Sequence, residues 1–272
     1  MTDQASSAAF RAIAHARRSA RRFQPGRIIP RPTLTDILES TLRAPSGFNL
    51  QPTQIIMVQS QDLKQQLAKH AMLGPGNQYR TQDSSVLAVF LSDLEAGKRI
   101  AKIHDLEWQA QSRHPNYLGQ MPLVSSFLLG QGHAATLVKN VATDFLAEWQ
   151  PMPVVEPIHA WAYKNTALVL QSYVLASTSH GLGTCIMEGF DARRLKDLLR
   201  VPDRYAACAC VATGYEYQDD NENEWDSKPS PRLALEEVVF GDTFGQAWDL
   251  HDSSDIVGAD HATGHQETVE KA

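Results

Sequence analysis

Residues 161–181, with the sequence WAYKNTALVLQSYVLASTSHG, place apolar side chains on nearly every side of a predicted helix. A helix of this kind must be buried all round, either inside a core or against another subunit. Gly181 stands where a C-cap glycine would end it. A chain of 272 residues that is 43% hydrophobic can supply the core that such a helix needs, as one large domain or as one domain with a long insertion.

Other segments on both sides of this helix have apolar residues at the spacing of a helix or a strand. Leucine and isoleucine recur at helical spacing after Thr33, which predicts a helix over 33–45 that Thr33 caps and Pro45 ends. Further helices are predicted over 63–73 and, capped by Asp191, over 191–200. Strands are predicted over 53–60, 84–93, 184–187, 205–216 and 232–242.

The region from 94 to 160 has a different character. Its aromatic residues are scattered and a proline-broken run, QPMPVVEP, follows them, so we interpret it as a helical insertion and not as a separate domain. Residues 1–250 are accordingly predicted to form a single domain. The tail over 251–272 has too little apolar content to fold alone and is predicted to be mobile.

The formal charge of −6 argues against a general nucleic-acid or membrane-surface binder, because such proteins usually carry a basic balance. The apolar runs are too short to span a bilayer, and residues 1–22 lack the apolar stretch of a secretory signal. Cys185, Cys208 and Cys210 form an odd set without disulfide spacing, which indicates the reducing cytoplasm. Cys208 and Cys210 are predicted to share one face of a strand. No histidine pair has metal-ligand spacing, so no metal site is predicted.

The run RRSARRF, which begins at Arg17, packs four arginines into six positions of this acidic chain. If the segment is helical, Arg17, Arg18, Arg21 and Arg22 share one face. They could then surround a dianionic phosphate, with Ser19 adding a hydroxyl. Two other interpretations compete: a solvated basic face, and an organelle transit peptide, because the surrounding segment is rich in Ala, Ser and Arg and free of acids.

Two further stretches combine turn residues with polar groups. In APSGFNLQP, a turn at Pro45 and Ser46 precedes the amides of Asn49 and Gln51. An amide offers the donor and the acceptor that the edge of a flavin or nucleobase needs, although ordinary turn chemistry also explains these residues.

In HGLGTCIMEGFD, glycines bracket an extended piece, so that main-chain N–H groups at Glu188 and Gly189 could face a ligand. The G-x-G-x-x-G spacing of a dinucleotide site is absent from the chain.

In this order, RRSARRF, APSGFNLQP and MEGFD make the sequence similar to the FMN-dependent nitroreductase family, over about residues 10–245 apart from the insertion. The resemblance implies an α+β fold with an antiparallel sheet flanked by helices. It also implies an intertwined homodimer that binds one FMN at each end of the subunit interface, with the apolar helix as the dimer contact and the last strand crossing to the partner. A transit peptide is then disfavoured, since its cleavage would remove residues that the site requires.

Carried over position by position, the resemblance implies which residues bind FMN. The phosphate and ribityl ends are assigned to Arg17, Arg18, Ser19, Lys228 and Arg232. The isoalloxazine ring and its pyrimidine edge are assigned to Arg21, Asn77 and Arg80. The loop beneath the ring and ribityl chain is assigned to Pro45, Ser46, Asn49 and Gln51. The main chain of Glu188 and Gly189 would face N5, so no catalytic side chain and no metal are implied.

The resemblance further implies that the flavin carries the chemistry. NADH or NADPH would pass hydride to N5, and a small aromatic acceptor such as a nitroaromatic or quinone would then take the electrons, which is a ping-pong mechanism. Arg21 and Arg80 would stabilise the charge of the reduced ring. Two alternatives stay open: a non-enzymatic flavin-binding or sensing protein, and a specialised dehalogenase or flavin-consuming enzyme of the same fold.

Overall fold

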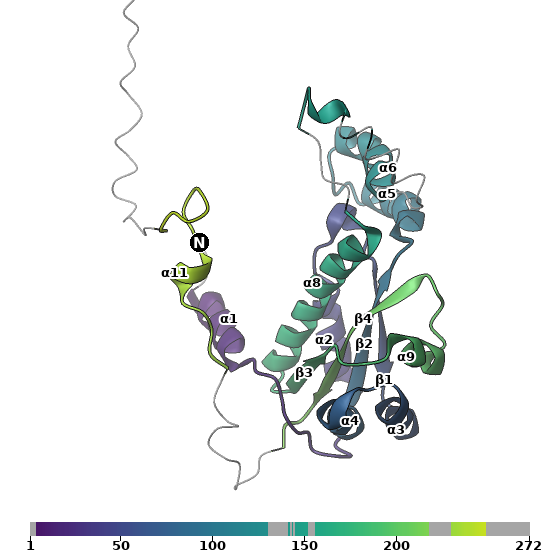
Figure 1. Ribbon diagram of the computed structural model, residues 1–272, viewed down its shortest axis with the longest axis vertical. Coiled ribbons are helices and arrows are strands. Elements are labelled where there is room, and N and C mark those ends of the chain that lie inside the picture. The colour runs from purple at the N-terminus through teal and green to yellow at the C-terminus, as the bar shows by residue number, and fades with distance from the viewer. Residues whose placement is uncertain are drawn as a thin grey trace, which may run out of the picture. The chain divides into compact units, whose positions relative to one another are not determined.

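Four antiparallel strands in the order β1-β2-β4-β3 form the centre of the computed structural model (Figure 1). All eight residues of β2 are buried, because successive side chains point to opposite faces and helices cover both faces. The strands confirm four of the five predicted from the sequence: β1 Thr53–Val58, β2 Val86–Asp93, β3 Gly183–Met187 and β4 Tyr205–Gly214.

The structure describes residues 4–129, 141, 143, 145–151, 156–217 and 230–248. The chain divides into two units, Met1–Asn223 and Glu224–Ala272. The sheet and every predicted site residue except Lys228 and Arg232 belong to the first unit. None of the helices in the described ranges is long and apolar enough to cross a membrane.

Helices cover each face of the sheet with a separate core. On one face, α2 (Arg31–Thr41) and α8 (Ile158–Ser179) bury Ile37 and Tyr173 against Phe90 of β2. On the other face, α3 (Gln61–His70) and α9 (Ala192–Leu199) bury Leu67 and Leu195 with Val89. Phe90 and Val89 are neighbours in β2, so the two cores follow directly from the alternation of side chains along a strand.

A third, smaller core lies beside the region that the sequence marks as an insertion. Two helices in this region, α5 (Ile100–Gln109) and α6 (Pro115–Leu129), follow the short 3-10 helix η2 (Ala96–Arg99). Their buried side chains, among them Ile103 and Met121, pack around Leu50, which is 0% exposed. The insertion therefore packs against the loop that precedes β1.

The remaining described elements connect or extend this framework. In the first unit they are α1 (Gln4–Ala16), the 3-10 helix η1 (Gly47–Asn49) and α4 (Gly74–Asp83), which packs against α3. The second unit contains the helical turn α11 (Leu235–Val238). This turn contradicts the strand predicted over 232–242, because Ala234 begins a helical turn in which the Glu237 carboxylate accepts from the Ala234 N–H at 2.9 Å.

Local capping rules hold at two helix ends and fail at a third. Gly181 has φ 71° just after α8, and its N–H donates to the Thr178 carbonyl, as a C-cap glycine does. The Asp191 carboxylate accepts from the Arg194 N–H at 3.0 Å and caps α9. The prediction that Thr33 caps α2 is wrong: Pro30 is the N-cap and a proline opens the first turn, because its fixed φ suits that position.

The assumption that residues 17–22 are helical is also wrong, because α1 ends at Ala16. Beyond that point the chain runs beside β3 through a bridge between Ser19 and Thr184. Its arginines are therefore spread along an extended segment rather than stacked on one helix face.

A bulge in β4 overturns the prediction that Cys208 and Cys210 share one face. Phe90 pairs with Ala209 while Leu91 pairs with Ala207, so Cys208 is left out of the register. Cys210 consequently lies in the core beneath α3 and α9. Cys208 instead lies beside the Ser92 side chain, which contacts α8.

Helix α8 buries only one of its faces within a single chain. Its buried residues include Ala162, Val169 and Tyr173, whereas Leu168 on the outer face is 45% exposed. The apolar sequence therefore exceeds what one chain buries, which leaves an apolar surface that a second subunit could cover.

Tyr173 provides a test of the core that lies between α8 and the sheet. It is fully buried and donates to the Thr213 hydroxyl at 3.0 Å. Burial raises the pKa of Tyr173 to about 12, whereas the unfolded chain titrates near the ordinary value of about 10. The unfolded state therefore loses this proton first, and the associated stability is complete below pH 10 and is lost as the pH rises toward 12.

We expect the wild-type free energy of unfolding to fall by about 1.4 kcal/mol more than that of Tyr173→Phe between pH 8 and pH 11. Urea unfolding of both proteins at the two pH values measures this difference. Equal losses in the two proteins would contradict the burial of the ionisable hydroxyl.

Candidate functional site

The extended arginine segment is attached to the edge strand β3 and to helix α4. The Ala20 N–H donates to the Thr184 carbonyl of β3 at 2.8 Å. The Ala20 carbonyl in turn accepts from Arg80 Nε of α4 at 3.2 Å. Arg80 therefore lies beside the arginine segment, although 60 residues separate it from Ala20 in the sequence.

The first two arginines of the segment differ in their electrostatic environment. Arg18 donates to the Glu216 carboxylate at 2.9 Å, and the two side chains are 40% and 25% exposed. Arg17 makes no ion pair with another described residue. Because Glu216 already balances the charge of Arg18, Arg17 is the better placed of the two to attract an added anion.

The turn at Glu188 and Gly189 is held against the connection between α3 and α4. The Gly189 carbonyl accepts from the Leu73 N–H at 2.9 Å and from the Asn77 amide at 3.1 Å. A Cβ at Gly189 would lie 2.6 Å from that amide nitrogen, so a side chain there would force the Asn77 amide to move. Within residues 156–217 and 4–129, the Gly189 N–H donates no hydrogen bond, which leaves it available to a ligand.

We call these residues of the arginine segment, α4 and the turn the β3-edge group. It comprises Arg17, Arg18, Ser19, Arg21, Asn77, Arg80, Glu188 and Gly189.

The loop before β1, residues 45–51, is strained. Phe48, Asn49 and Gln51 have φ values of 51°, 55° and 47°, a region that residues other than glycine adopt at a cost. We call this segment the amide loop. Such a conformation persists only where the surroundings hold it, and it is concentrated at functional sites.

Two side chains hold the main chain of the amide loop: Ser46, which belongs to the loop, and Asn165, which belongs to α8. The Ser46 hydroxyl accepts from the Gln51 N–H at 2.9 Å. The Asn165 side chain of α8 accepts from the Gly47 N–H at 2.7 Å. Gly47 also allows close packing, because a Cβ there would lie 3.2 Å from the Trp161 ring.

Arg99 links the amide loop to a buried carboxylate. Its guanidinium donates to the Gln51 main-chain carbonyl and lies 3.2 Å from a carboxylate oxygen of Asp93, whose side chain is 0% exposed. Asp93 also accepts from Arg204 Nε at 3.1 Å. The strained loop is thus held by a charge cluster at the end of β2.

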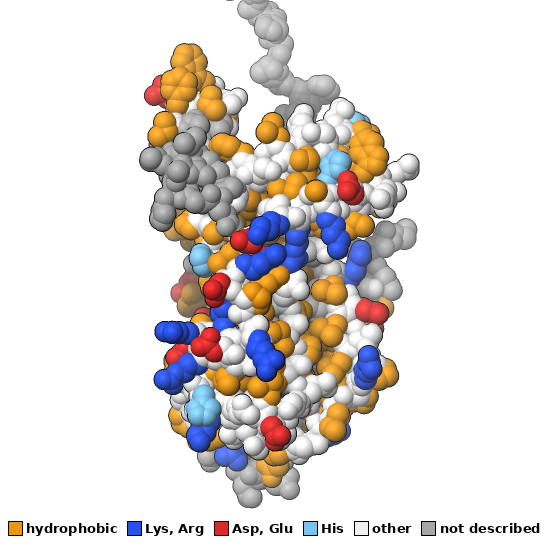
Figure 2. Space-filling model, turned by 90° about the vertical axis from the view of Figure 1, so that its right-hand side faces the viewer, with side chains coloured by type: hydrophobic (Ala, Val, Ile, Leu, Met, Phe, Trp, Pro, Cys, Tyr) orange, Lys and Arg blue, Asp and Glu red, His pale blue; other side chains and the backbone are white. Residues whose placement is uncertain are grey.

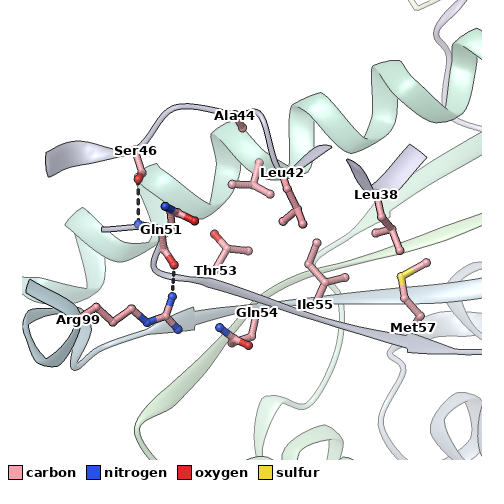
Figure 3. Close-up of a pocket in the computed structure, with 11 residues that line it drawn as sticks. Leu38, Leu42, Ala44, Ser46, Gln51, Thr53, Gln54, Ile55, Met57 and Arg99 are labelled. Atoms are coloured by element: carbon pink, nitrogen blue, oxygen red, sulfur yellow. Dashed lines mark hydrogen bonds between the residues drawn. The ribbon is translucent and has the colours of Figure 1, made fainter. Parts of the chain in front are cut away.

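A pocket of about 380 Å³ opens beside the amide loop. Figure 3 shows Ser46, Gln51 and Arg99 at its polar end and the apolar side chains of α2 and β1 along its wall. Those apolar residues are Leu38 of α2, Leu42 directly after it, and Ile55 and Met57 of β1. The pocket can accept a partly apolar ligand with polar groups at one end.

The β3-edge group and the amide loop lie apart within one chain. Strands β1 and β3 are the two edges of the sheet, with two strands between them, a separation of about 14 Å. The loop is attached to α8 at Asn165, and that helix continues to Ser179 before β3 begins, a distance of about 21 Å along its axis. One chain therefore does not bring all the predicted FMN contacts together.

Basic side chains gather locally on the surface despite the net charge of −6. Figure 2 shows a group of Lys and Arg side chains close together near the middle of one face, among apolar side chains. A local basic surface of this kind suits an anionic small molecule better than a long polyanion.

Burial disfavours the thiolate form of all three cysteines. Burial raises the pKa of Cys185, although Arg80 lowers it in part. Burial raises the pKa of Cys210 to about 12. Both thiols therefore stay protonated at neutral pH, and a thiolate is the form that reacts.

Sequence reasoning missed three residues that hold the amide loop: Arg99, Glu107 and Asn165. None stands in a motif, so the sequence carried no sign of them. The β3-edge group does not include two of the assigned phosphate contacts. Lys228 falls outside the described residues, and Arg232 belongs to the second unit, where its guanidinium donates to the Ser230 and Pro231 carbonyls. Their roles stay predictions.

Comparison with known sequences gives a consistent set of relatives. The sequence model described as the Nitroreductase family matches residues 14–215. A Thermus thermophilus protein named NADH dehydrogenase is 30% identical over 224 residues, which cover 82% of this chain and 91% of that protein. A Bacillus subtilis protein named as the NAD(P)H nitroreductase MhqN is 26% identical over 82% of this chain and 96% of its own length.

Comparison with solved structures shows the same fold. The Bacillus subtilis nitroreductase ydfN has a TM-score of 0.65 at 25% identity, covering 86% of this chain and 98% of that chain. A nitroreductase of Exiguobacterium sibiricum, solved in complex with FMN, has a TM-score of 0.66 at 21% identity, covering 85% and 95%. The predicted α+β fold with helices around an antiparallel sheet is confirmed.

Proposed function

The chain belongs to the nitroreductase family, and from this membership we propose that it is an FMN-dependent oxidoreductase that takes hydride from NADH or NADPH and passes electrons to a small aromatic acceptor. The observation that carries the proposal is the β3-edge group. Its groups include Arg17, which makes no ion pair with a described residue, Arg80 of α4, and the Gly189 N–H, which donates to no described residue. Hydrogen bonds join the three segments that carry these groups, from Arg80 to Ala20 and from Asn77 to Gly189. These are the groups that a phosphate, an anionic ring and a ring nitrogen require.

The chain's own residues have separate tasks in this proposal. Arg17 and Ser19 bind the phosphate, with Arg18 as a weaker contact because Glu216 shares its charge. Arg21 and Arg80 would face the ring and would stabilise negative charge there. The Gly189 N–H orients N5. FMN, when bound, supplies the chemistry by accepting hydride from the nicotinamide and releasing electrons to the acceptor in a ping-pong cycle.

A homodimer completes the site in this proposal. The amide loop lies at the opposite sheet edge from the β3-edge group, so we assign the loop contacts of each FMN to the second subunit. The exposed apolar face of α8, with Leu168 at 45% exposure, supports such an interface. The three unpaired cysteines fit a reducing compartment, and we place the protein in the cytoplasm.

Anaerobic reduction tests the proposal. We expect the purified protein to be yellow, or to become yellow with added FMN, and its flavin absorbance to bleach within seconds of adding NADH or NADPH. A nitroaromatic or quinone should then restore the colour without consuming the flavin. Free FMN with the same nicotinamide and no protein is the control for uncatalysed reduction.

Each outcome separates the proposal from its alternatives. Bound flavin that neither nicotinamide bleaches would contradict an enzyme and favour a flavin-binding or sensing protein. Flavin destroyed during turnover would favour a flavin-consuming enzyme. A colourless protein indifferent to FMN would overturn the cofactor assignment itself.

A further inference from the structure

Glu107 is a buried carboxylate from the insertion that contacts the amide loop. It lies on α5 with 6% exposure, and its Oε1 accepts from the Asn49 amide at 3.1 Å. Its Oε2 is buried and has no hydrogen-bond partner among the described residues. Arg113 approaches Oε1 only to 3.9 Å. A buried carboxylate that is half satisfied costs stability, so general stabilisation does not explain its position.

The chemistry of this carboxylate sets the direction of two amide side chains. Asn49 turns its NH₂ group toward Glu107, because the Glu107 Oε1 atom accepts the hydrogen bond between them. The Asn49 carbonyl oxygen then faces Gln51, and it accepts from the Gln51 Nε2 at 3.2 Å. Gln51 is therefore left with its own side-chain oxygen directed away from the relay.

The outward oxygen belongs to a side chain that a ligand can reach. Gln51 is exposed and lines the pocket beside the loop (Figure 3). Its main chain is already fixed, because Ser46 accepts its N–H and Arg99 donates to its carbonyl. With the main chain held by these contacts, the polarity of the side-chain amide depends on the relay through Asn49.

We propose that Glu107 is a positioning residue that turns the side-chain oxygen of Gln51 toward the bound flavin. The loop then recognises a hydrogen-bond donor of the ligand, a ribityl hydroxyl or a ring N–H, and repels an acceptor such as the phosphate. This inference rests on the proposed function, because it takes FMN as the ligand of the loop. It gives the insertion a role in cofactor recognition.

Glu107→Gln should reverse the relay. One of the two polar groups of a glutamine must occupy the unpartnered Oε2 position, and an unpaired carbonyl is tolerated better there than an unpaired NH₂. The new NH₂ then donates to Asn49, which donates to Gln51, and Gln51 presents its own NH₂ outward. Only a small fraction of the protein molecules then presents the Gln51 oxygen outward, so we expect the FMN dissociation constant to rise about tenfold.

A second substitution should rescue the first. The side chain of Gln51→Glu cannot donate to Asn49. In the single variant, a carboxylate oxygen at position 51 therefore faces the Asn49 carbonyl oxygen, both of them acceptors, and FMN binding should weaken about tenfold. In the Glu107→Gln background, Asn49 is free to donate to the new carboxylate, which again presents an oxygen outward. We expect Glu107→Gln/Gln51→Glu, which has the wild-type net charge, to bind FMN within about threefold of wild type.

The experiment measures FMN dissociation constants by flavin fluorescence for the wild type, both single variants and the double variant. Glu156→Gln, an exposed carboxylate paired with Lys164, is the control for the change of charge and should bind FMN within about twofold of wild type. Rescue by the double variant supports the relay, because purely structural or charge effects would leave it at least as weak as Gln51→Glu alone. A double variant that weak overturns the inference.

Two other results can also be interpreted: a Glu107→Gln variant that does not fold, and a wild-type protein that binds no FMN. If Glu107→Gln does not fold, Asn49→Gly removes the middle of the relay at a left-handed position that glycine tolerates. Gln51→Glu should then change FMN binding by less than about twofold in that background, and a tenfold loss there overturns the relay. If the wild-type protein binds no FMN, the proposed function fails, whereas wild-type binding without rescue defeats this inference alone.

Discussion

The double variant Arg17→Ala/Ser19→Ala is expected to lose FMN during gel filtration, with a dissociation constant raised at least about a hundredfold. The Arg17 side chain makes no ion pair with another described residue, so its charge is available to the phosphate. Ser19 bridges to Thr184 through its main chain, and its alanine variant should therefore keep the segment in place. Flavin absorbance of the eluted protein measures the loss.

Two control variants show whether the loss of FMN is specific to Arg17 and Ser19. Arg193→Ala removes an exposed arginine of α9 and should leave FMN binding within about twofold of wild type. Arg18→Ala should have a smaller effect than Arg17→Ala, because Glu216 already pairs with Arg18. Full flavin retention by the double variant would remove the arginine segment from the phosphate site.

The second large effect is expected at Asp93, where Asp93→Ala should lower the free energy of unfolding by about 3 kcal/mol. Its carboxylate is completely buried and accepts from Arg204 and from the Glu95 N–H, while Arg99 lies 3.2 Å away. Removing it leaves Arg204 with only the more distant Glu95 carboxylate, at 3.9 Å, and leaves Arg99 with the Gln51 carbonyl but no carboxylate, which weakens the support of the amide loop. The melting temperature should fall by about 6–12 °C.

Urea unfolding of the wild type and of Asp93→Ala measures the change, with Asp197→Ala as the matched control. Asp197 is an exposed aspartate of α9, and its removal should alter stability by less than about 0.5 kcal/mol. Similar stabilities for Asp93→Ala and the control would mean that the buried charge cluster does not hold the fold together.

Short-range patterns account for the parts of the fold that were predicted correctly. The buried run of β2 and the caps at Asp191 and Gly181 depend on residues within a few positions of one another. The order of three motifs was enough to identify the family, because each motif is contiguous. Features that depend on residues within about ten positions of one another can therefore be predicted from the sequence.

Errors occurred where the outcome depended on contacts between distant segments. A helix would place the arginine run on one face, but pairing with β3 holds the run extended, and Thr184 lies far along the chain. The cysteines of β4 were expected on one face, but the register against β2 places a bulge at Cys208. Neither the partner strand nor its register is encoded locally.

By itself, the sequence determined the family, the four strands of the sheet and the residue types that a flavin phosphate requires, because periodicity, caps and contiguous motifs act over short distances. The tertiary structure decided how those residues are grouped, since it separates the amide loop from the β3-edge group. It also supplied Glu107 and Asn165, which meet the loop across 58 and 118 residues of chain. Packing alone brings such positions together, and no local pattern records it.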